Sequence, residues 1–220
     1  MTSTNLESNH MTLNVSTRLS LLVALLASAT GLASAAPAVA GSTDKFELSS
    51  PDIAPGSKID DKFVLNGFGC KGGNISPALQ WKNAPAGTKS FVLQVYDPDA
   101  PTGSGFWHWT VNNIPANVTQ LTQGAGNAPA NLPAGAYGGV NDFQDTGATG
   151  GNGNYGGPCP PAGDKPHRYE FSLFALAVDD IDAAAGVPKT GTAALHGFVL
   201  NKGLGDKLLG KASFTAAYGH

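Results

Sequence analysis

The chain has 220 residues, of which 41% are hydrophobic and only 13% are charged, and it contains 29 Gly and 15 Pro. A charged fraction about half the usual quarter, together with so much Gly and Pro, argues against long amphipathic helices and coiled coils and predicts strands and turns. A net charge of -3 argues against nucleic-acid binding, and the hydrophobic fraction argues against disorder. The length suits one sizeable domain, or at most two small ones.

The N-terminal region has the layout of a secretory signal. A basic residue precedes an apolar run at 19–27, and A-x-A patterns follow at 33–35 and 38–40. An uncleaved membrane anchor is the alternative, but the apolar run is much shorter than the ~20 residues that span a bilayer. We therefore expect residues 1–40 to be a signal peptide with an over-extended start, residues 41–220 to be a single domain, and the protein to be periplasmic or secreted.

The cysteine inventory consists of Cys70 and Cys159. An even number of cysteines in an exported chain favours one disulfide between them. Two free, half-buried thiols are the alternative. A zinc site is not expected, because the two cysteines show no C-x-x-C spacing.

The first half of the domain contains three segments with strand-like patterns. Residues 46–50 alternate in polarity, and residues 62–65 can continue as a second short strand. Residues 90–96 form a nearly continuous β-prone run, as expected of a central strand that is covered on both faces.

Two further strands carry predictions about which side chains share a face. Within residues 106–111 we expect the side chains of Trp107, Trp109 and Val111 on one face of the strand. Those of Phe106, His108 and Thr110 are expected on the other face. In the strand at 168–177, which His167 opens, the shared face is expected to hold His167, Tyr169, Phe171 and Leu173.

The segment between these strands, residues 124–166, has 12 Gly and 6 Pro. Its aromatic residues Tyr137, Phe143 and Tyr155 predict a functional loop folded back onto the body of the domain, although an interdomain linker would have a similar composition. After it, we expect a short turn or helix at 179–186, an interrupted helix at 192–208 and a last strand at 212–218.

Side chains suited to chemistry gather in three places. The Asp-Pro-Asp-Ala-Pro run at 97–101 directly follows the central strand, and its prolines stiffen the backbone that bears the two carboxylates. His108 lies within a strand between two tryptophans, and Lys-Pro-His-Arg-Tyr at 165–169 opens the next strand. Taken singly, the first reads as a turn and the second as a core histidine.

Taken together, these motifs closely resemble the phosphatidylethanolamine-binding protein family, and most of all its bacterial Raf-kinase-inhibitor-like branch. The resemblance rests on the Asp-Pro-Asp-Ala-Pro run, on Trp-His-Trp at 107–109 and on Gly-Gly-Pro-Cys-Pro-Pro at 156–161, which leads into His-Arg-Tyr. Asn-Ile-Ser-Pro-Ala-Leu-Gln-Trp at 74–81 and Ala-Pro-Ala-Gly-Thr at 84–88 also match. The resemblance covers about residues 46–218.

The resemblance implies a mostly β fold, in which a large antiparallel sheet packs against a smaller sheet, with short peripheral helices. It also implies a small-anion pocket at the ends of the central strands that accepts phosphate, phosphoethanolamine, other phospholipid head groups or a carboxylate. The matching ligand-binding positions are Asp97, Asp99, Pro101, His108, His167 and Tyr169. Members of the family outside this branch have Gly and a variable residue before the histidine, where this chain has Lys165 and Pro166. The C-terminal helix that partly covers the pocket in animal members has no clear counterpart here. We therefore expect a more open site.

A binding mechanism follows from the charges of these residues. Carboxylates repel an anion, so the two aspartates are expected to act as partners of the two histidines. A carboxylate that accepts a hydrogen bond from His108 or His167 would fix its tautomer, raise its pKa and leave the other N–H facing the pocket. Backbone N–H groups of Gly156 and Gly157 are expected to add donors. Binding should then strengthen as the pH falls towards 6.

Other functions are weaker expectations. The sequence lacks the closely spaced ligands typical of a hydrolytic metal site, and it lacks the nucleophile elbow of a Ser-His-Asp hydrolase. We therefore expect no catalytic residue, metal or cofactor, and we do not expect the chain to be an enzyme. The alternative is a surface-acting inhibitor whose protein partner would be an extracytoplasmic enzyme or a host protein. Nucleic acid is not an expected partner, and membrane contact is expected only through the signal segment or lipid head groups.

Overall fold

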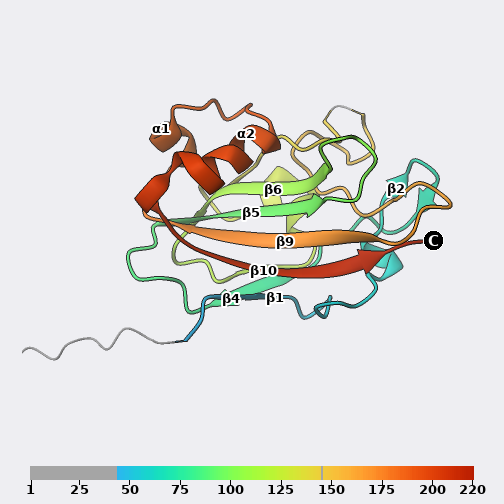
Figure 1. Ribbon diagram of the computed structural model, residues 1–220, viewed down its shortest axis with the longest axis horizontal. Coiled ribbons are helices and arrows are strands. Elements are labelled where there is room, and N and C mark those ends of the chain that lie inside the picture. Colours follow the sequence, from blue (N-terminus) through green and yellow to red (C-terminus); the bar gives the residue numbers. More distant parts are fainter. Residues whose placement is uncertain (1–43, 145) are drawn as a thin grey trace, which may run out of the picture. The chain divides into compact units, whose positions relative to one another are not determined.

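Two antiparallel sheets pack face to face in the computed structural model, which describes residues 44–144 and 146–220 (Figure 1). The large sheet has five strands in the order β10-β9-β5-β6-β8, and the smaller one has three in the order β1-β4-β7. A two-stranded hairpin, β2-β3, stands apart from both. The expected mostly β fold with a large antiparallel sheet, smaller sheets and a few short helices is confirmed.

The strands are β1 (Glu47–Ser49), β2 (Asn66–Gly67), β3 (Cys70–Lys71), β4 (Leu79–Lys82), β5 (Ser90–Asp97), β6 (Phe106–Pro115), β7 (Gln120–Leu121), β8 (Tyr137–Gly138), β9 (His167–Leu176) and β10 (Leu208–Tyr218). The helical segments are η1 (Asp61–Phe63), η2 (Ala125–Asn127), η3 (Pro129–Asn131), α1 (Ile181–Ala185), α2 (Ala193–Phe198), the π-helix η4 (Val199–Gly203) and η5 (Gly205–Lys207). Within the described ranges, no helix is long and apolar enough to cross a membrane. The expected signal segment, residues 1–40, lies outside the described residues.

Strand β5 is the central element of the core. It pairs with β6 on one edge and β9 on the other, and most of its side chains are buried. On one face Phe91, Leu93 and Val95 belong to the core between the sheets, where the Phe91 ring meets Trp81 of β4 edge-on at 5.5 Å. On the other face Val92 belongs to a second cluster, with Leu200 and other apolar residues of the helical region. The prediction of a central strand covered on both faces is confirmed.

Strand β6 has an extra residue at each of two irregularities in its pairing with β5, and the one at His108 overturns the predicted facing of its side chains. Val95 pairs with Trp109, but Tyr96 pairs with Trp107, so His108 is the extra residue of a β-bulge. Trp109 is fully buried in the core, whereas the Trp107 ring lies tilted against Tyr96 on the opposite face, with the ring centres 4.5 Å apart. The bulge interrupts the two-residue alternation on which the prediction rested.

The segment 62–65 is not the short strand that we expected. Asp60 accepts a hydrogen bond from the backbone N–H of Lys62 at 2.9 Å and caps the 3-10 turn η1. This capping bond favours a turn over an extended conformation. The turn fully buries the Phe63 side chain.

The Gly/Pro-rich segment folds back onto the sheets, as predicted. Tyr155 and Phe143 are buried, and the Tyr155 hydroxyl donates to the Phe63 carbonyl at 2.8 Å. The expected helix at 179–186 is α1, which ends at Gly186 with a φ of 67°. The interrupted helix at 192–208 is the succession α2, η4 and η5.

A disulfide joins Cys70 and Cys159, whose sequence separation is 89. It ties β3, in the hairpin, to the end of the Gly/Pro-rich segment. The favoured prediction of a bridge is therefore confirmed over the alternative of two free thiols.

Removing this bridge should destabilise the fold. In the chain-entropy model, a closed loop of this length contributes on the order of 4 kcal/mol. For a domain of this size, we expect the Cys70→Ser/Cys159→Ser variant to melt about 10 °C below the oxidised protein. Calorimetry of both forms tests this, with the wild-type chain in reductant as control. Equal melting temperatures, or two titratable thiols in the native wild-type protein, would contradict it.

Candidate functional site

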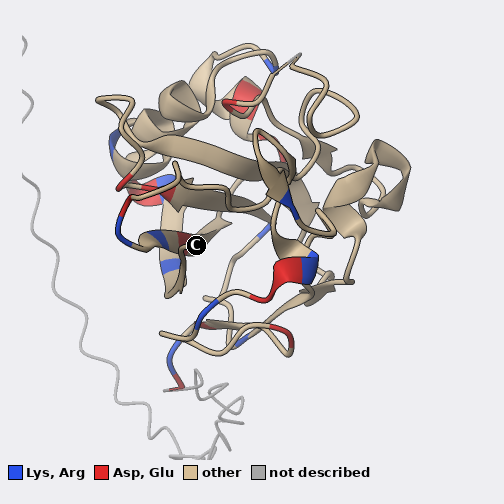
Figure 2. Cartoon of the chain, turned by 90° about the vertical axis from the view of Figure 1, so that its right-hand side faces the viewer, with Lys and Arg blue, Asp and Glu red and all other residues tan. Residues whose placement is uncertain are grey.

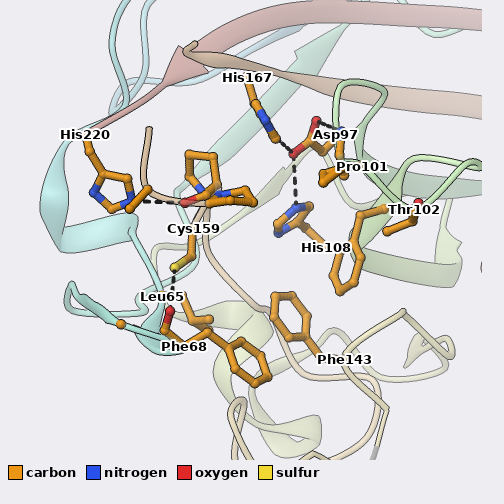
Figure 3. A pocket seen from close by; sticks show the side chains of 16 residues that line it. Leu65, Phe68, Asp97, Pro101, Thr102, His108, Phe143, Cys159, His167 and His220 are labelled. Atoms are coloured by element: carbon orange, nitrogen blue, oxygen red, sulfur yellow. Dashed lines mark hydrogen bonds and ion pairs between the residues drawn. The ribbon is translucent and has the colours of Figure 1, made fainter. Parts of the chain in front are cut away.

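A pocket with a cavity volume of about 480 Å³ lies where β5 ends and β9 begins, next to the C-terminal residue. Figure 2 shows this end of the molecule, where the C-terminus lies. The lining is mainly apolar, and Figure 3 shows the side chains that line it. Such a cavity falls within the size range of small-molecule sites.

Three titratable groups of the pocket come from three adjacent strands. Asp97 ends β5, His167 opens β9, and His108 is the bulge residue of β6. All three are buried, with 2%, 2% and 5% of their surface exposed. Figure 3 shows Asp97 between the two rings: its Oδ2 atom lies 2.8 Å from Nδ1 of His167 and 4.0 Å from Nε2 of His108. The structure thus brings these three predicted site residues together.

The Asp97 carboxylate is held rigidly. Its Oδ1 atom accepts hydrogen bonds from the backbone N–H groups of Asp99 and Ala100, at 2.8 and 3.1 Å. Its Oδ2 atom accepts the Nδ1–H of His167. The turn that follows β5 therefore fixes the carboxylate in one orientation, with Oδ2 also facing His108.

The tautomer of His108 follows from its hydrogen bond to the main chain. Its Nδ1 atom lies 2.9 Å from the carbonyl oxygen of Gly156, which can only accept, so Nδ1 carries a proton. In the neutral ring, Nε2 is then unprotonated and faces Asp97. Burial lowers the pKa of His108 below its ordinary 6.5, although the Gly156 carbonyl and the Asp97 charge act in the opposite direction. The Asp97 carboxylate thus acts on this pKa in the expected direction, but the net shift is downward because desolvation outweighs the charge.

The second nitrogen of His167 faces another carboxylate. Its Nε2 atom lies 3.4 Å from Oδ2 of Asp164, a residue of the loop before β9. His167 therefore lies between the carboxylates of Asp97 and Asp164.

Aromatic rings form the wall from the histidines to the pocket mouth. The Phe106 ring lies 5.1 Å from His108 and 4.9 Å from Phe143, and Phe143 stacks on Phe68 at 6.3 Å. Phe68 is 68% exposed and has a φ of 51°, a conformation uncommon for a bulky residue, in the tight turn of the β2-β3 hairpin. Pro101, which was predicted at the site, lines the same pocket.

Two of the predicted side chains, those of Asp99 and Tyr169, do not line the pocket. Asp99 binds Arg168 through both carboxylate oxygens, at 2.8 and 2.9 Å, and also accepts the Arg168 backbone N–H. These bonds hold the pKa of Asp99 well below its usual range and tie the turn after β5 to the start of β9. Tyr169 is buried beside the His108 ring, at 5.2 Å and edge-on, and burial followed by the Asp97 charge raises its pKa.

The main-chain donors expected at Gly156 and Gly157 are already engaged. The Gly156 N–H donates to the His108 carbonyl at 3.0 Å, and the Gly157 N–H donates to Oδ1 of Asn74 at 2.8 Å. A side chain at Gly157 would collide with the backbone of Phe63. Gly157 is therefore needed for close packing, and the expectation that it donates to an anion is wrong for this structure.

Sequence reasoning missed several residues that line the pocket. Phe68 and Phe143 were not assigned to it, although Phe143 stood out as an aromatic residue in a Gly-rich segment. His220 also lines the pocket, and its Nε2–H donates to the Pro160 carbonyl at 2.9 Å. No local motif marks His220. In the part of the chain that the structure describes, no group of three or more His, Cys, Asp or Glu residues could hold a metal ion.

Comparisons with known proteins match most of the chain. The UPF0098 protein YbcL of Escherichia coli K12 is 49% identical over 157 residues, which are 71% of this chain and 80% of that protein. The UPF0098 protein YbhB of the same organism is 42% identical over 173 residues, 79% of this chain and 99% of that protein. Both relatives are therefore matched over more than two thirds of their length.

Solved structures and a family model give the same result. The crystal structure of E. coli YbcL aligns with a TM-score of 0.69 at 44% identity, covering 80% of this chain and 99% of that one. The homologue CT736 of Chlamydia trachomatis aligns with a TM-score of 0.58 at 27% identity, covering 80% and 97%. The family model described as "Phosphatidylethanolamine-binding protein" matches residues 49–217. The chain belongs to the phosphatidylethanolamine-binding protein family.

Proposed function

We propose that the chain is a binding protein for phosphate monoesters, which it takes up as protonated monoanions in the pocket of Asp97 and His108. One observation carries the proposal: Oδ2 of Asp97 and Nε2 of His108 face each other at 4.0 Å, in a pocket where both side chains are buried. The first atom accepts a hydrogen bond, and the second can take up a proton and then donate one.

This pair of side chains favours anions that carry a hydrogen they can donate. An ionised carboxylate repels an anion that has no hydrogen to donate, whereas a phosphate monoanion keeps one P–O–H group. That group would donate to Oδ2 of Asp97, while a second phosphate oxygen accepts the Nε2–H of protonated His108. Sulfate carries no such proton at neutral pH. Among the anions that the resemblance implies, a protonated phosphate therefore fits best.

Ligand binding would be coupled to the uptake of a proton by His108. In the free protein, burial lowers the His108 pKa, so the ring is neutral at neutral pH. Because folding disfavours the protonated ring, the unfolded chain takes up the proton more readily than the folded protein does. The folded protein therefore loses stability as the pH falls below about 6.5. A bound anion supplies the missing counter-charge and raises this pKa. Affinity should therefore increase as the pH falls.

The rest of the pocket suits the organic part of a monoester. Phe106, Phe143 and Phe68 form a continuous aromatic wall from His108 to the exposed mouth. Contact with this wall would favour a phosphate that carries an apolar substituent over inorganic phosphate.

Asp97→Asn should remove the discrimination between phosphate and sulfate. The wild-type protein is expected to bind phosphoethanolamine or inorganic phosphate and to reject sulfate, because sulfate cannot donate to the carboxylate. The asparagine amide can donate, so sulfate should bind the variant at least about tenfold more tightly than the wild type. Isothermal calorimetry with each ion tests this.

The control for that variant is Asp182→Asn. Asp182 is a buried carboxylate that accepts from a histidine Nε2 at 2.8 Å outside the pocket, so its loss should leave ion selectivity unchanged. Equal binding of sulfate and phosphate by the wild-type protein would refute the proposal.

His108→Asn should abolish the pH dependence of affinity. The asparagine amide can still donate to the Gly156 carbonyl, but nothing replaces Nε2. With the affinity expressed per phosphate monoanion, wild-type binding should strengthen several-fold from pH 7.5 to below the ordinary histidine pKa of about 6.5. The variant should bind weakly at every pH. His196→Asn, in the Asp182 pair, is the matched control, and wild-type affinity that is flat with pH would contradict the mechanism.

We also propose that the chain functions in the periplasm or after secretion. The Cys70–Cys159 disulfide supports this location, since disulfides persist in oxidising compartments. A relative that is 36% identical over 140 residues is described as putative lipoprotein LppC of Mycobacterium tuberculosis. Cell fractionation with intact-mass measurement tests the proposal: a chain that begins near residue 36 or 41 outside the cytoplasm supports it, and a full-length cytoplasmic chain refutes it.

A further inference from the structure

A second cavity, of about 440 Å³, lies on the other face of the large sheet, against α2 and the π-helix η4. Its sheet side is formed by side chains of β5, β6, β9 and β10. Figure 1 shows α2 beside these strands. We propose that this groove is a second binding site, independent of the phosphate pocket, and that it takes a neutral saccharide ring.

An aromatic platform forms one part of the groove. The rings of Tyr96 and Trp107 lie 4.5 Å apart and both are partly exposed, and the Tyr96 hydroxyl donates to the Ser104 carbonyl at 2.8 Å, which fixes that ring. Phe198 of α2, which also lines the groove, is 64% exposed. The C–H face of a pyranose ring packs well on such aromatic surfaces, whose bodies are apolar and whose edges are polar.

Two mostly buried polar side chains line the groove next to this platform. Gln94 and Ser172 are register partners on β5 and β9, and each is 6% exposed. The Gln94 Nε2 group donates to the Ala193 carbonyl at a long 3.4 Å. Among the described residues, neither Oε1 of Gln94 nor Oγ of Ser172 has a hydrogen-bond partner, and neither is a fully buried atom, so both reach the surface of the groove. These two atoms are therefore free to pair with the hydroxyl groups of a ligand.

The rim of the groove argues against other ligand classes. Glu170 opposes an anion, while Lys202 and Lys211 oppose a cation. A purely apolar molecule would leave Gln94 and Ser172 unsatisfied. A neutral ring whose hydroxyls both donate and accept satisfies the amide, the hydroxyl and the charged rim together. The π-helix supplies Asn201 and Lys202 to the same groove, and π-helical turns are frequent at functional sites.

Saturation-transfer NMR on the full chain tests the proposal, with glucose, N-acetylglucosamine and their β-linked disaccharides as probes. At least one of these saccharides should receive magnetisation and change the fluorescence of Trp107, the one tryptophan of the three in the described residues that is not buried. Trp107→Ala should weaken this binding about tenfold or more, and so should Gln94→Leu, which removes the amide at similar size. Ser172→Ala, the mildest change, covers the case in which either variant fails to fold.

His108→Asn is the matched control, because it alters the phosphate pocket and should leave saccharide binding unchanged. Phosphate should not displace the saccharide. No transfer to any of these probes would overturn the proposal. Saccharide binding that survives Gln94→Leu and Ser172→Ala, or that phosphate displaces, would overturn it as well. Phosphate binding at the first pocket is measured separately, so failure of one proposal leaves the other standing.

Discussion

One extra residue in β6 determines how the large sheet presents its functional side chains. Because His108 is a bulge residue, Trp107 and Trp109 point to opposite faces of the sheet. Trp109 completes the core between the two sheets, and His108 is directed into the pocket beside Asp97. Without the bulge, the regular alternation would place Trp107 with Trp109 and leave the second groove without its aromatic platform.

Burial and charge compete at His108, and their balance sets the protonation state of its ring. The Gly156 carbonyl holds the Nδ1 proton, and Asp97 offers a nearby negative charge, yet desolvation keeps the free ring neutral. The pocket therefore presents two acceptors, the Asp97 carboxylate and the unprotonated Nε2 of His108. Under the proposed function, a protonated anion would donate to the carboxylate, and its negative charge would raise the pKa of His108 so that Nε2 gains a proton and donates to it.

Short motifs predicted the centre of this site well. Asp97, His108 and His167 come from three separate motifs, and the strands that bear them are neighbours in the sheet. The strands at 90–96 and 168–177 were also predictable. The first is a nearly continuous apolar run, and the second has side chains that alternate between two faces. The fold-back of residues 124–166 followed from aromatic side chains that a solvated linker would not carry.

The failures have local physical causes that composition does not reveal. A β-bulge cannot be recognised from the alternation of polar and apolar residues in the sequence. The face of the sheet on which Trp107 lies was therefore predicted wrongly. The capping bond from Asp60 turned an apparent strand into η1. Asp99 looked equivalent to Asp97 in the motif, yet Arg168 engages it outside the pocket. Gly157 was expected to donate to a ligand, but its N–H is taken by Asn74 from a distant part of the chain.

The protonation state of His108 tests the account most directly. Long-range proton–nitrogen NMR spectra of the histidine rings, recorded at neutral pH with and without phosphoethanolamine, report the tautomer and the charge of each ring. The account predicts that free His108 is neutral with its proton on Nδ1, and that ligand addition converts it to the doubly protonated ring. A His108 signal that shows an Nε2 proton in the free protein, or that stays neutral when the pocket is saturated, would contradict it.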